Sequence, residues 1–235
     1  MLFQQPFISV IRTNFAGMEI NTVIFDMDGL LIDSEPLWNE AAFEQFQKLG
    51  ITLDKKQFSL TTGLRTKEFV TWWFDHFKLD NTHLQETESE IIRAVTNKVL
   101  DRGKAQPGIS HILNFFMARK FKIGLASSSP ISLINTVIDY LGIRGPIQAI
   151  TSGASLEYGK PHPQVYLNCA DQLKASPLEC ITFEDSYNGM VAAKAARMKC
   201  VVVPAVGHLN DPRWHAADLK ISSLQNFNEL LMNSM

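Results

Sequence analysis

The amino-acid sequence predicts an α/β protein with a doubly wound, mainly parallel sheet into which a separate helical module is inserted. The run Val23-Ile24-Phe25 is continuously apolar, as in strands buried on both faces of a parallel sheet. Farther along the chain, strand and helix patterns alternate regularly, which indicates parallel strands joined by helices. The next comparable strand pattern, at 121–126, begins about ninety residues after the first, whereas a strand–helix–strand unit takes about thirty. We therefore expect a helical insertion between the first two core strands.

The composition is that of a globular protein and argues against several partners. The chain has 235 residues, of which 46% are apolar and 20% charged, and its net charge is -2. It has no basic block, so we expect neither nucleic acid nor a membrane surface as a partner. No apolar run approaches the roughly 18 residues of a spanning helix. The three cysteines have no metal-binding spacing and lie in or beside apolar runs, which is typical of buried thiols in a reducing compartment. We expect a monomeric cytoplasmic protein.

Three segments follow from these patterns. Residues 1–17 are interpreted as a dispensable extension or a misplaced start, because Met18 offers a more economical start, with a small docked segment as the alternative. They carry neither a basic start nor a small-residue cleavage site, which argues against a secretory signal. Residues 18–32 and 104–235 form the predicted core. Residues 33–103 form the predicted inserted module.

The inserted module is predicted to be helical throughout. Helices are expected at 35–49, 66–78 and 84–102, each with an apolar stripe at helical spacing. For the first of them, Ser34 is the expected N-cap, Pro36 lies in the first turn and Gly50 is the expected stop. Pro107 and Gly108 mark the return to the core.

The rest of the chain alternates between the two kinds of element. The expected helices are 109–119, 131–141, 163–173, 188–197 and 224–231. The expected strands are 121–126, 147–151, 180–183, 201–203 and 218–221. This order completes the parallel sheet that the first strand begins.

Carboxylates follow two of the predicted strands. Asp26 and Asp28 end the first strand and precede Gly29, and Glu184 and Asp185 end a later one. The carboxyl ends of parallel strands lie at the edge where open α/β sheets bind ligands. Carboxylate oxygens suit a hard cation such as Mg²⁺. These residues predict a magnesium site.

Groups suited to a phosphate occur at the same kind of position. Ser127 and Ser128 end the second strand, just before Pro130 starts a helix whose first amides are free. Lys160 lies between a glycine and a proline in a later connection. Each feature alone has a plainer interpretation as a turn, a helix cap or a solvated loop charge. Their recurrence at successive strand ends favours phosphoryl transfer.

The motifs in order resemble those of the haloacid dehalogenase superfamily of phosphohydrolases. They are D-x-D-G, hydrophobic-A-S, G-K-P-x-P and E-D-S-x-x-G. The helical insertion after the first strand resembles the β-phosphoglucomutase-like branch, with a Rossmann-like core and a helical cap. Segments 31–38, 63–65, 160–167 and 210–213 are especially similar to bacterial hexitol and 2-deoxyglucose 6-phosphate phosphatases.

The resemblance implies roles for the acidic residues. Asp26 would be the nucleophile that forms an aspartyl-phosphate, and Asp28 the general acid and base. Mg²⁺ would be held by the Asp26 carboxylate, the Asp28 main-chain carbonyl and Asp185. Glu184 would lie in the outer shell or reach the ion through water.

The resemblance also implies a binding site for a sugar phosphate. Lys160, Ser127 and Ser128 would hold the phosphate oxygens, and Gly29 would let the backbone turn beside them. The inserted module would close as a cap over the site and exclude water. In the cap, Arg65 is the candidate cation facing substrate.

Two alternatives to a sugar phosphatase stay open. A phosphomutase would return the phosphoryl group to the sugar. Mutases of this branch commonly carry a histidine where this chain has Trp38, which favours hydrolysis. A catalytically silent phosphate-binding protein on the same fold is the second alternative. Trp38 or Trp72 is expected to pack on a sugar ring.

Overall fold

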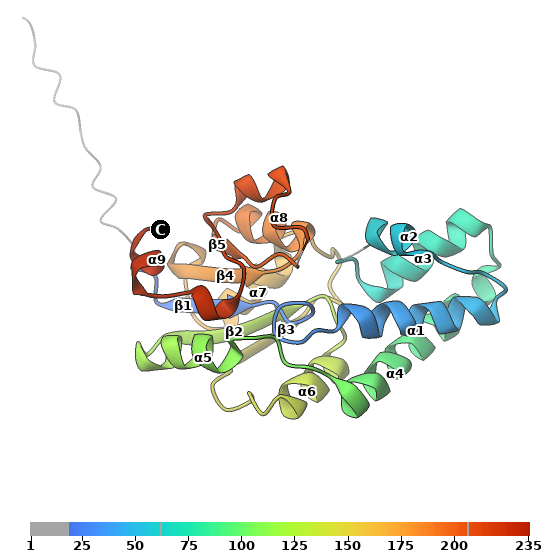
Figure 1. The fold of residues 1–235 in the computed structure, drawn as a ribbon, viewed down its shortest axis with the longest axis horizontal. Helices are drawn as coiled ribbons and strands as arrows, with labels where there is room; N and C mark the ends of the chain where they lie inside the picture. The colour runs from blue at the N-terminus through green and yellow to red at the C-terminus, as the bar shows by residue number, and fades with distance from the viewer. Residues whose placement is uncertain (1–18, 62, 206) are drawn as a thin grey trace, which may run out of the picture.

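The computed structural model describes residues 19–61, 63–205 and 207–235, which form two halves (Figure 1). One half is a sheet with helices on both faces, and the other is a group of helices at one end of the molecule. The prediction for residues 1–17 falls outside the described residues. No helix within the described residues is long and apolar enough to span a membrane.

The sheet has six strands in the described part of the chain, and all the pairings between neighbours are parallel. The strands are β1 (Thr22–Phe25), β2 (Lys122–Ser127), β3 (Ala149–Ser152), β4 (Cys180–Glu184), β5 (Lys199–Val202) and β6 (Leu219–Lys220). Their order across the sheet is β3-β2-β1-β4-β5-β6, so β1 lies between β2 and β4. The predicted fold class is confirmed. The order also brings the ends of β1, β2 and β4 together at one edge.

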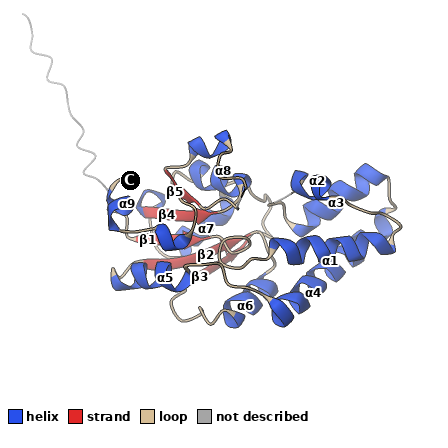
Figure 2. Cartoon of the chain, viewed as in Figure 1, coloured by secondary structure: helices blue, strands red, loops and turns tan. Residues whose placement is uncertain are grey.

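Helices cover both faces of this sheet (Figure 2). They are α5 (Ile109–Ala118), α6 (Ile131–Tyr140), α7 (Gln164–Gln172), α8 (Tyr187–Ala195) and α9 (Glu229–Asn233). Successive residues of β1 point to opposite faces, and all are buried. Val23 and Phe25 join one apolar cluster with α5 and α6, whereas Ile24 joins a second with α7 and α8. Each fully buried apolar side chain of this size contributes about 1.5–3 kcal/mol.

The inserted module, called the cap from here on, consists of α1 (Glu35–Lys48), α2 (Lys55–Leu60), α3 (Thr66–Phe77), a 3-10 turn (Asn81–His83) and α4 (Leu84–Arg102). Its interior is aromatic and aliphatic, with Phe46, Trp73, Phe74 and Val95 almost fully buried. These side chains belong to the same apolar cluster as one face of the sheet. The cap is therefore packed against the core rather than tethered to it.

The chain passes between the two halves twice, and the two passages lie side by side. The main-chain N–H of Asp33 donates to the carbonyl of Lys104 at 2.9 Å, and Gln106 N–H donates to the carbonyl of Leu31 at 2.9 Å. Between them Ile32 forms an antiparallel bridge with Ala105. The expected boundaries at 32/33 and 103/104 fall within this paired segment.

Three sequence expectations about the elements differ from the structure. The expected terminal helix 224–231 is wrong: a 3-10 turn (Leu224–Asn226) and α9 are separated by Phe227 and Asn228, both extended, and Phe227 is fully buried. Helix α2 was not expected, although Asp54 and Gln57 form a capping box at its start. Ser34 lies at the N-cap position of α1, but its side chain does not cap the helix.

Candidate active site

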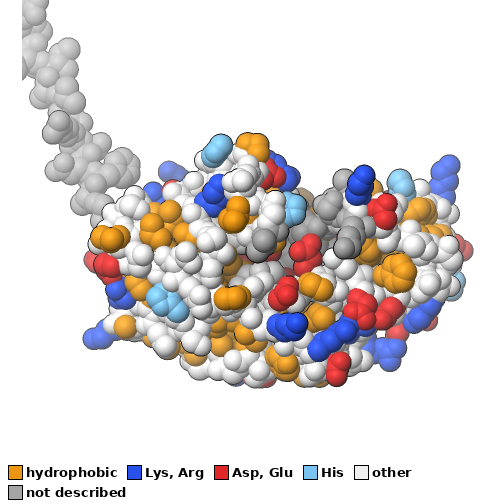
Figure 3. Space-filling model, in the orientation of Figure 1, with side chains coloured by type: hydrophobic (Ala, Val, Ile, Leu, Met, Phe, Trp, Pro, Cys, Tyr) orange, Lys and Arg blue, Asp and Glu red, His pale blue; other side chains and the backbone are white. Residues whose placement is uncertain are grey.

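A cavity of about 150 Å³ lies between the cap and the carboxyl ends of β1, β2 and β4. On the face drawn in Figure 3, the surface is hollowed between the two halves, with acidic side chains beside the hollow. The core lines the cavity with the predicted site residues Asp26, Asp28, Gly29, Ser127, Ser128, Lys160 and Asp185. The cap lines it with polar and apolar side chains, among them Glu35, Trp38, Asn39 and Phe69. Predicted site residues from four separate segments thus meet in one cavity.

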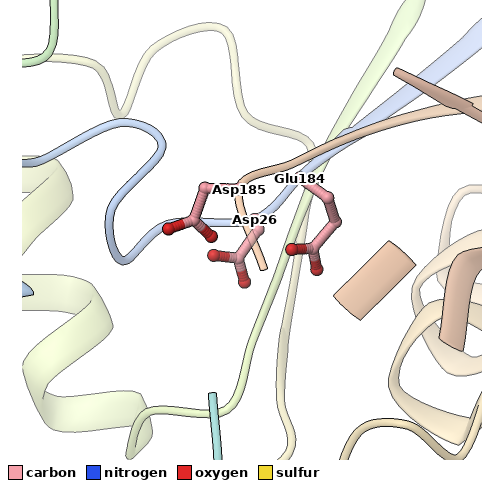
Figure 4. A group of neighbouring side chains, drawn as sticks. All are labelled: Asp26, Glu184 and Asp185. Carbon is pink, nitrogen blue, oxygen red and sulfur yellow. The ribbon is translucent and has the colours of Figure 1, made fainter. Parts of the chain in front are cut away.

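Three carboxylates form a cluster at the sheet edge (Figure 4). One oxygen each of Asp26, Glu184 and Asp185 lies within 4.8 Å of the others. Asp26 extends β1, and Glu184 and Asp185 lie at the end of the neighbouring β4. This cluster contains the three side chains that the sequence indicated for a metal.

Lys160 lies buried among these carboxylates. Its Nζ donates to Asp26 Oδ1 and to Glu184 Oε1, both at 2.6 Å. It also donates to the main-chain carbonyl of Ala126, at the end of β2, at 3.2 Å. One cation therefore faces three acids, and the cluster has an excess of negative charge.

Burial makes this excess costly, and the pKa shifts show it. Desolvation raises the pKa of Asp26 to about 8, against the opposing attraction of Lys160. Desolvation also raises the pKa of Asp185 well above its ordinary value, with added repulsion from Asp26 and Glu184. The pKa of Lys160 is raised, because the attraction of Asp26 and Glu184 outweighs the effect of its burial. A further positive charge would relieve the acids.

The donor set fits a hard divalent cation. The Asp185 carboxylate accepts no hydrogen bond from the described residues, and Asp26 uses only Oδ1, so both retain free oxygens. Glu184 differs, because Oε1 accepts from Lys160 and the Tyr166 hydroxyl, while Oε2 accepts from the Ser186 N–H and hydroxyl. Asp26 and Asp185 are therefore better placed than Glu184 to contact a metal directly.

Asp28 occupies a different environment from Asp26. Its Oδ1 accepts from Ser34 Oγ at 2.7 Å and from Trp38 Nε1 at 2.9 Å. Its Oδ2 accepts from Ser129 Oγ at 2.7 Å and from Ser127 Oγ at 3.3 Å. Lys160 does not contact it. The two aspartates of the first motif thus have separate partners, as two different chemical roles require.

The comparisons with known proteins match this geometry. The family model for haloacid dehalogenase-like hydrolases matches residues 23–203, a span that includes all of these groups. The chain belongs to this family.

Relatives of this hydrolase family cover nearly the whole chain. Hexitol phosphatase B of Escherichia coli K12 is 40% identical over 207 residues, which are 88% of this chain and 93% of that protein. Fructose-1-phosphate phosphatase YqaB of the same strain is 28% identical, over 77% of this chain and 95% of that one. A β-phosphoglucomutase structure from Clostridium difficile superposes with a TM-score of 0.81 at 25% identity, covering 91% of this chain and 96% of that one. The resemblance drawn from the motifs is confirmed.

Two glycines of this hydrolase make room for the acids. Gly29 has φ +76°, a conformation that glycine tolerates best, and a Cβ there would overlap Asp185 Oδ2. Gly189, in the first turn of α8, faces Glu184, and a Cβ there would overlap that carboxylate. The backbone therefore approaches both carboxylates more closely than any side chain would allow.

Arg65 and Trp72 do not line the cavity. The Arg65 guanidinium, in the cap, donates to the carbonyls of Leu156 at 2.5 Å and Gly153 at 3.4 Å, both in the core loop after β3, and it pairs with Glu68. The structure therefore corrects the expectation that Arg65 faces substrate. The Arg65 side chain instead joins the cap to the core. Trp72 is 41% exposed and stacks on His76, whereas Trp38 does line the cavity.

Three residues of the site were not singled out in the sequence. Tyr166 is fully buried on α7 and donates to Glu184. It lies in segment 160–167, which resembles the phosphatases, but the resemblance assigned it no role. Ser129 and Ser34 donate to Asp28. Ser34 was expected only as the N-cap of the first cap helix, and Ser129 lies beside Ser127 and Ser128, the serines expected to hold phosphate. A half-buried carboxylate needs hydrogen-bond donors, but which residues supply them can be seen only once the fold is known.

Proposed function

We propose that this chain is a Mg²⁺-dependent phosphatase that hydrolyses phosphomonoesters of small sugars or hexitols through an aspartyl-phosphate on Asp26. The observation that carries the proposal is the meeting of Asp26, Lys160 and Asp185 at one sheet edge, in a cavity that the cap covers. The hexitol and fructose-1-phosphate phosphatases named above support the substrate class.

The chain's own groups account for the first chemical step. Asp26 is the nucleophile, and its attack on a phosphate dianion brings like charges together. Lys160 offsets part of this charge from 2.6 Å, and Ser127, Ser128 and the free amides at the start of α6 line up on the same rim to hold the phosphate oxygens. Asp26, the Asp28 main-chain carbonyl and Asp185, with Glu184 behind them, would hold a Mg²⁺ ion, which would supply the remaining positive charge.

Asp28 handles the proton in both steps. It protonates the departing sugar oxygen as the phosphorus–oxygen bond breaks, and then takes a proton from the water that attacks the aspartyl-phosphate. Its hydroxyl and indole partners, rather than Lys160, surround it in the structure. Asp26, by contrast, is paired with the Lys160 ammonium.

The cap (33–103) closes over the core (18–32 and 104–235) and excludes water from the reacting centre. Support comes from the cap residues Glu35, Trp38 and Asn39, which line the cavity opposite the carboxylates. We also propose a monomer in the cytoplasm, where the three buried thiols at Cys169, Cys180 and Cys200 stay reduced.

A phosphomutase is the second candidate, because the β-phosphoglucomutase structure shares the fold at 25% identity. One assay separates the candidates. Purified protein is incubated with Mg²⁺ and a panel of hexose and hexitol phosphates, and both free phosphate and isomerised sugar phosphate are measured. We expect free phosphate, and Asp26→Asn should abolish its release without changing the far-UV circular dichroism spectrum. Isomer without phosphate release would establish the mutase, and no turnover of any ester would leave a phosphate-binding protein.

A further inference from the structure

The carboxylate of Asp28 is held from both halves of the molecule. On one side, Trp38 Nε1 in the cap helix α1 donates to Oδ1 at 2.9 Å, beside Ser34 Oγ at 2.7 Å. On the other, the core residues Ser129 and Ser127 donate to Oδ2 at 2.7 and 3.3 Å. Four donors from two directions fix the plane of a carboxylate far better than one.

The four donors are not equivalent. A serine hydroxyl can donate or accept, so it can reverse its hydrogen bond when the carboxyl gains a proton. An indole N–H can only donate. Oδ1 therefore remains an acceptor toward Trp38 throughout, whereas both partners of Oδ2 can turn around. Oδ2 is also the oxygen on the core side, bonded to Ser127 at the end of β2.

We propose that Trp38 is a positioning residue for Asp28: its indole N–H holds Oδ1, and this leaves Oδ2 as the oxygen that delivers and removes the catalytic proton. The proposal rests on the role given to Asp28 in the proposed function. It differs from the sequence expectation that Trp38 packs on a sugar ring, because the N–H and not the ring face carries the effect. It also ties proton transfer to the cap, because α1 brings the donor.

Trp38→Phe removes the N–H and keeps an aromatic ring in the same place. The variant is compared with wild type in single-turnover reactions with Mg²⁺ on two substrates, a hexose 6-phosphate and p-nitrophenyl phosphate. A sugar alkoxide must be protonated as it leaves, whereas p-nitrophenolate is a stable anion. We expect sugar release to slow by about tenfold, the size of one lost hydrogen bond, with KM within about twofold. The first release of p-nitrophenolate should stay within about twofold of wild type.

Three further comparisons make the test independent of folding. Ser34→Ala removes the other donor to Oδ1 and should show the same substrate contrast, more weakly, because the indole remains. Trp72→Phe changes an exposed cap tryptophan that lies away from the cavity, and should leave both rates unchanged. In an Asp28→Asn background, Trp38→Phe should cost no further rate, because a residue that acts only through Asp28 has nothing left to position.

The results that would contradict these expectations can be told apart from one another. A raised KM with equal slowing of both substrates would show that the Trp38 ring contacts substrate, and the proposal would be overturned. Independent, multiplicative losses in the double variant would overturn it as well. If wild type itself released no phosphate from any ester, the proposed function would fail first, and the comparison of variants would have no baseline.

Discussion

At Gly29 the structure leaves no room for a side chain beside Asp185. An alanine there would place a Cβ 2.8 Å from Cγ of Asp185 and overlapping its Oδ2. The atom in the way is the end of a side chain, so the fold can survive, but the carboxylate must move. Gly29→Ala should therefore displace a proposed metal ligand while leaving the sheet intact.

The chain offers a matched control for the backbone part of this change. Gly50 has φ +77°, almost the same as the +76° of Gly29, and a Cβ there has nothing within 4 Å. Each alanine should incur about 1–2 kcal/mol for the left-handed backbone, reduced by about 0.4–1 kcal/mol because the unfolded chain is also restricted. Gly50→Ala thus measures the backbone cost alone, and the difference between the variants isolates the contact with Asp185.

Magnesium binding should reveal the difference between Gly29→Ala and Gly50→Ala. At a Mg²⁺ concentration of about one hundred times Kd, the ion should stabilise wild type and Gly50→Ala by about 2.7 kcal/mol. A tenfold weaker site in Gly29→Ala would lower this gain to about 1.4 kcal/mol, and a ligand displaced by about 1 Å should slow turnover by about a hundredfold. Urea unfolding with Mg²⁺ and with EDTA measures the stabilisation by magnesium, and an assay of phosphate release measures turnover. Equal magnesium stabilisation and equal activity in the two variants would refute the reasoning.

Three further predictions concern the acid cluster and the contact between the halves. Without metal, the free energy of unfolding should fall as pH rises from about 5 to 8, because folding raises the pKa of Asp26 from 3.8 to about 8 and the folded state holds a proton that the unfolded chain has lost. Urea titrations in EDTA should show this slope, and it should shrink in Asp26→Asn; a slope of opposite sign would contradict the shift. Tyr166→Phe removes a donor to the buried Glu184 and should lower stability by about 1.5–3 kcal/mol, a change below about 0.5 kcal/mol being the contrary result. Arg65→Ala should speed hydrogen exchange in the core loop after β3, where its guanidinium binds two carbonyls, and unchanged exchange would show that this contact does not hold the loop.

The fold was predictable because its signals are local. A buried parallel strand such as β1 must be apolar on both faces, and the helices between strands show their stripes at helical spacing. The terminal helix failed for a non-local reason. Phe227 fits a helical pattern, but in the structure its backbone is extended and its ring is fully buried in the core. Tertiary packing outweighed local propensity there.

The site residues likewise divide into those with a local signal in the sequence and those whose role depends on packing. Asp26, Lys160 and Asp185 could be found because each follows a strand, and the topology of a parallel sheet brings such positions to one edge. Arg65 could not be placed, because a cation in an inserted module can bind either substrate or the core, and only the packing of the cap decides. Tyr166 lies in segment 160–167, which resembles the phosphatases, but its hydrogen bond to Glu184 depends on the neighbouring β4 and does not follow from that segment.

The paired passages at Ile32 and Ala105 have a consequence for how such an enzyme can change over evolutionary time. The chain leaves the core for the cap and returns to the core at adjoining points that are hydrogen-bonded to each other. An insert of different sequence joined at those points would leave the strand order of the sheet unchanged. The insert is not independent of the chemistry, however, because its residues Ser34 and Trp38 donate to the carboxylate of Asp28. A relative's insert grafted at this junction should therefore leave the reacting groups in place only if it supplies equivalent donors.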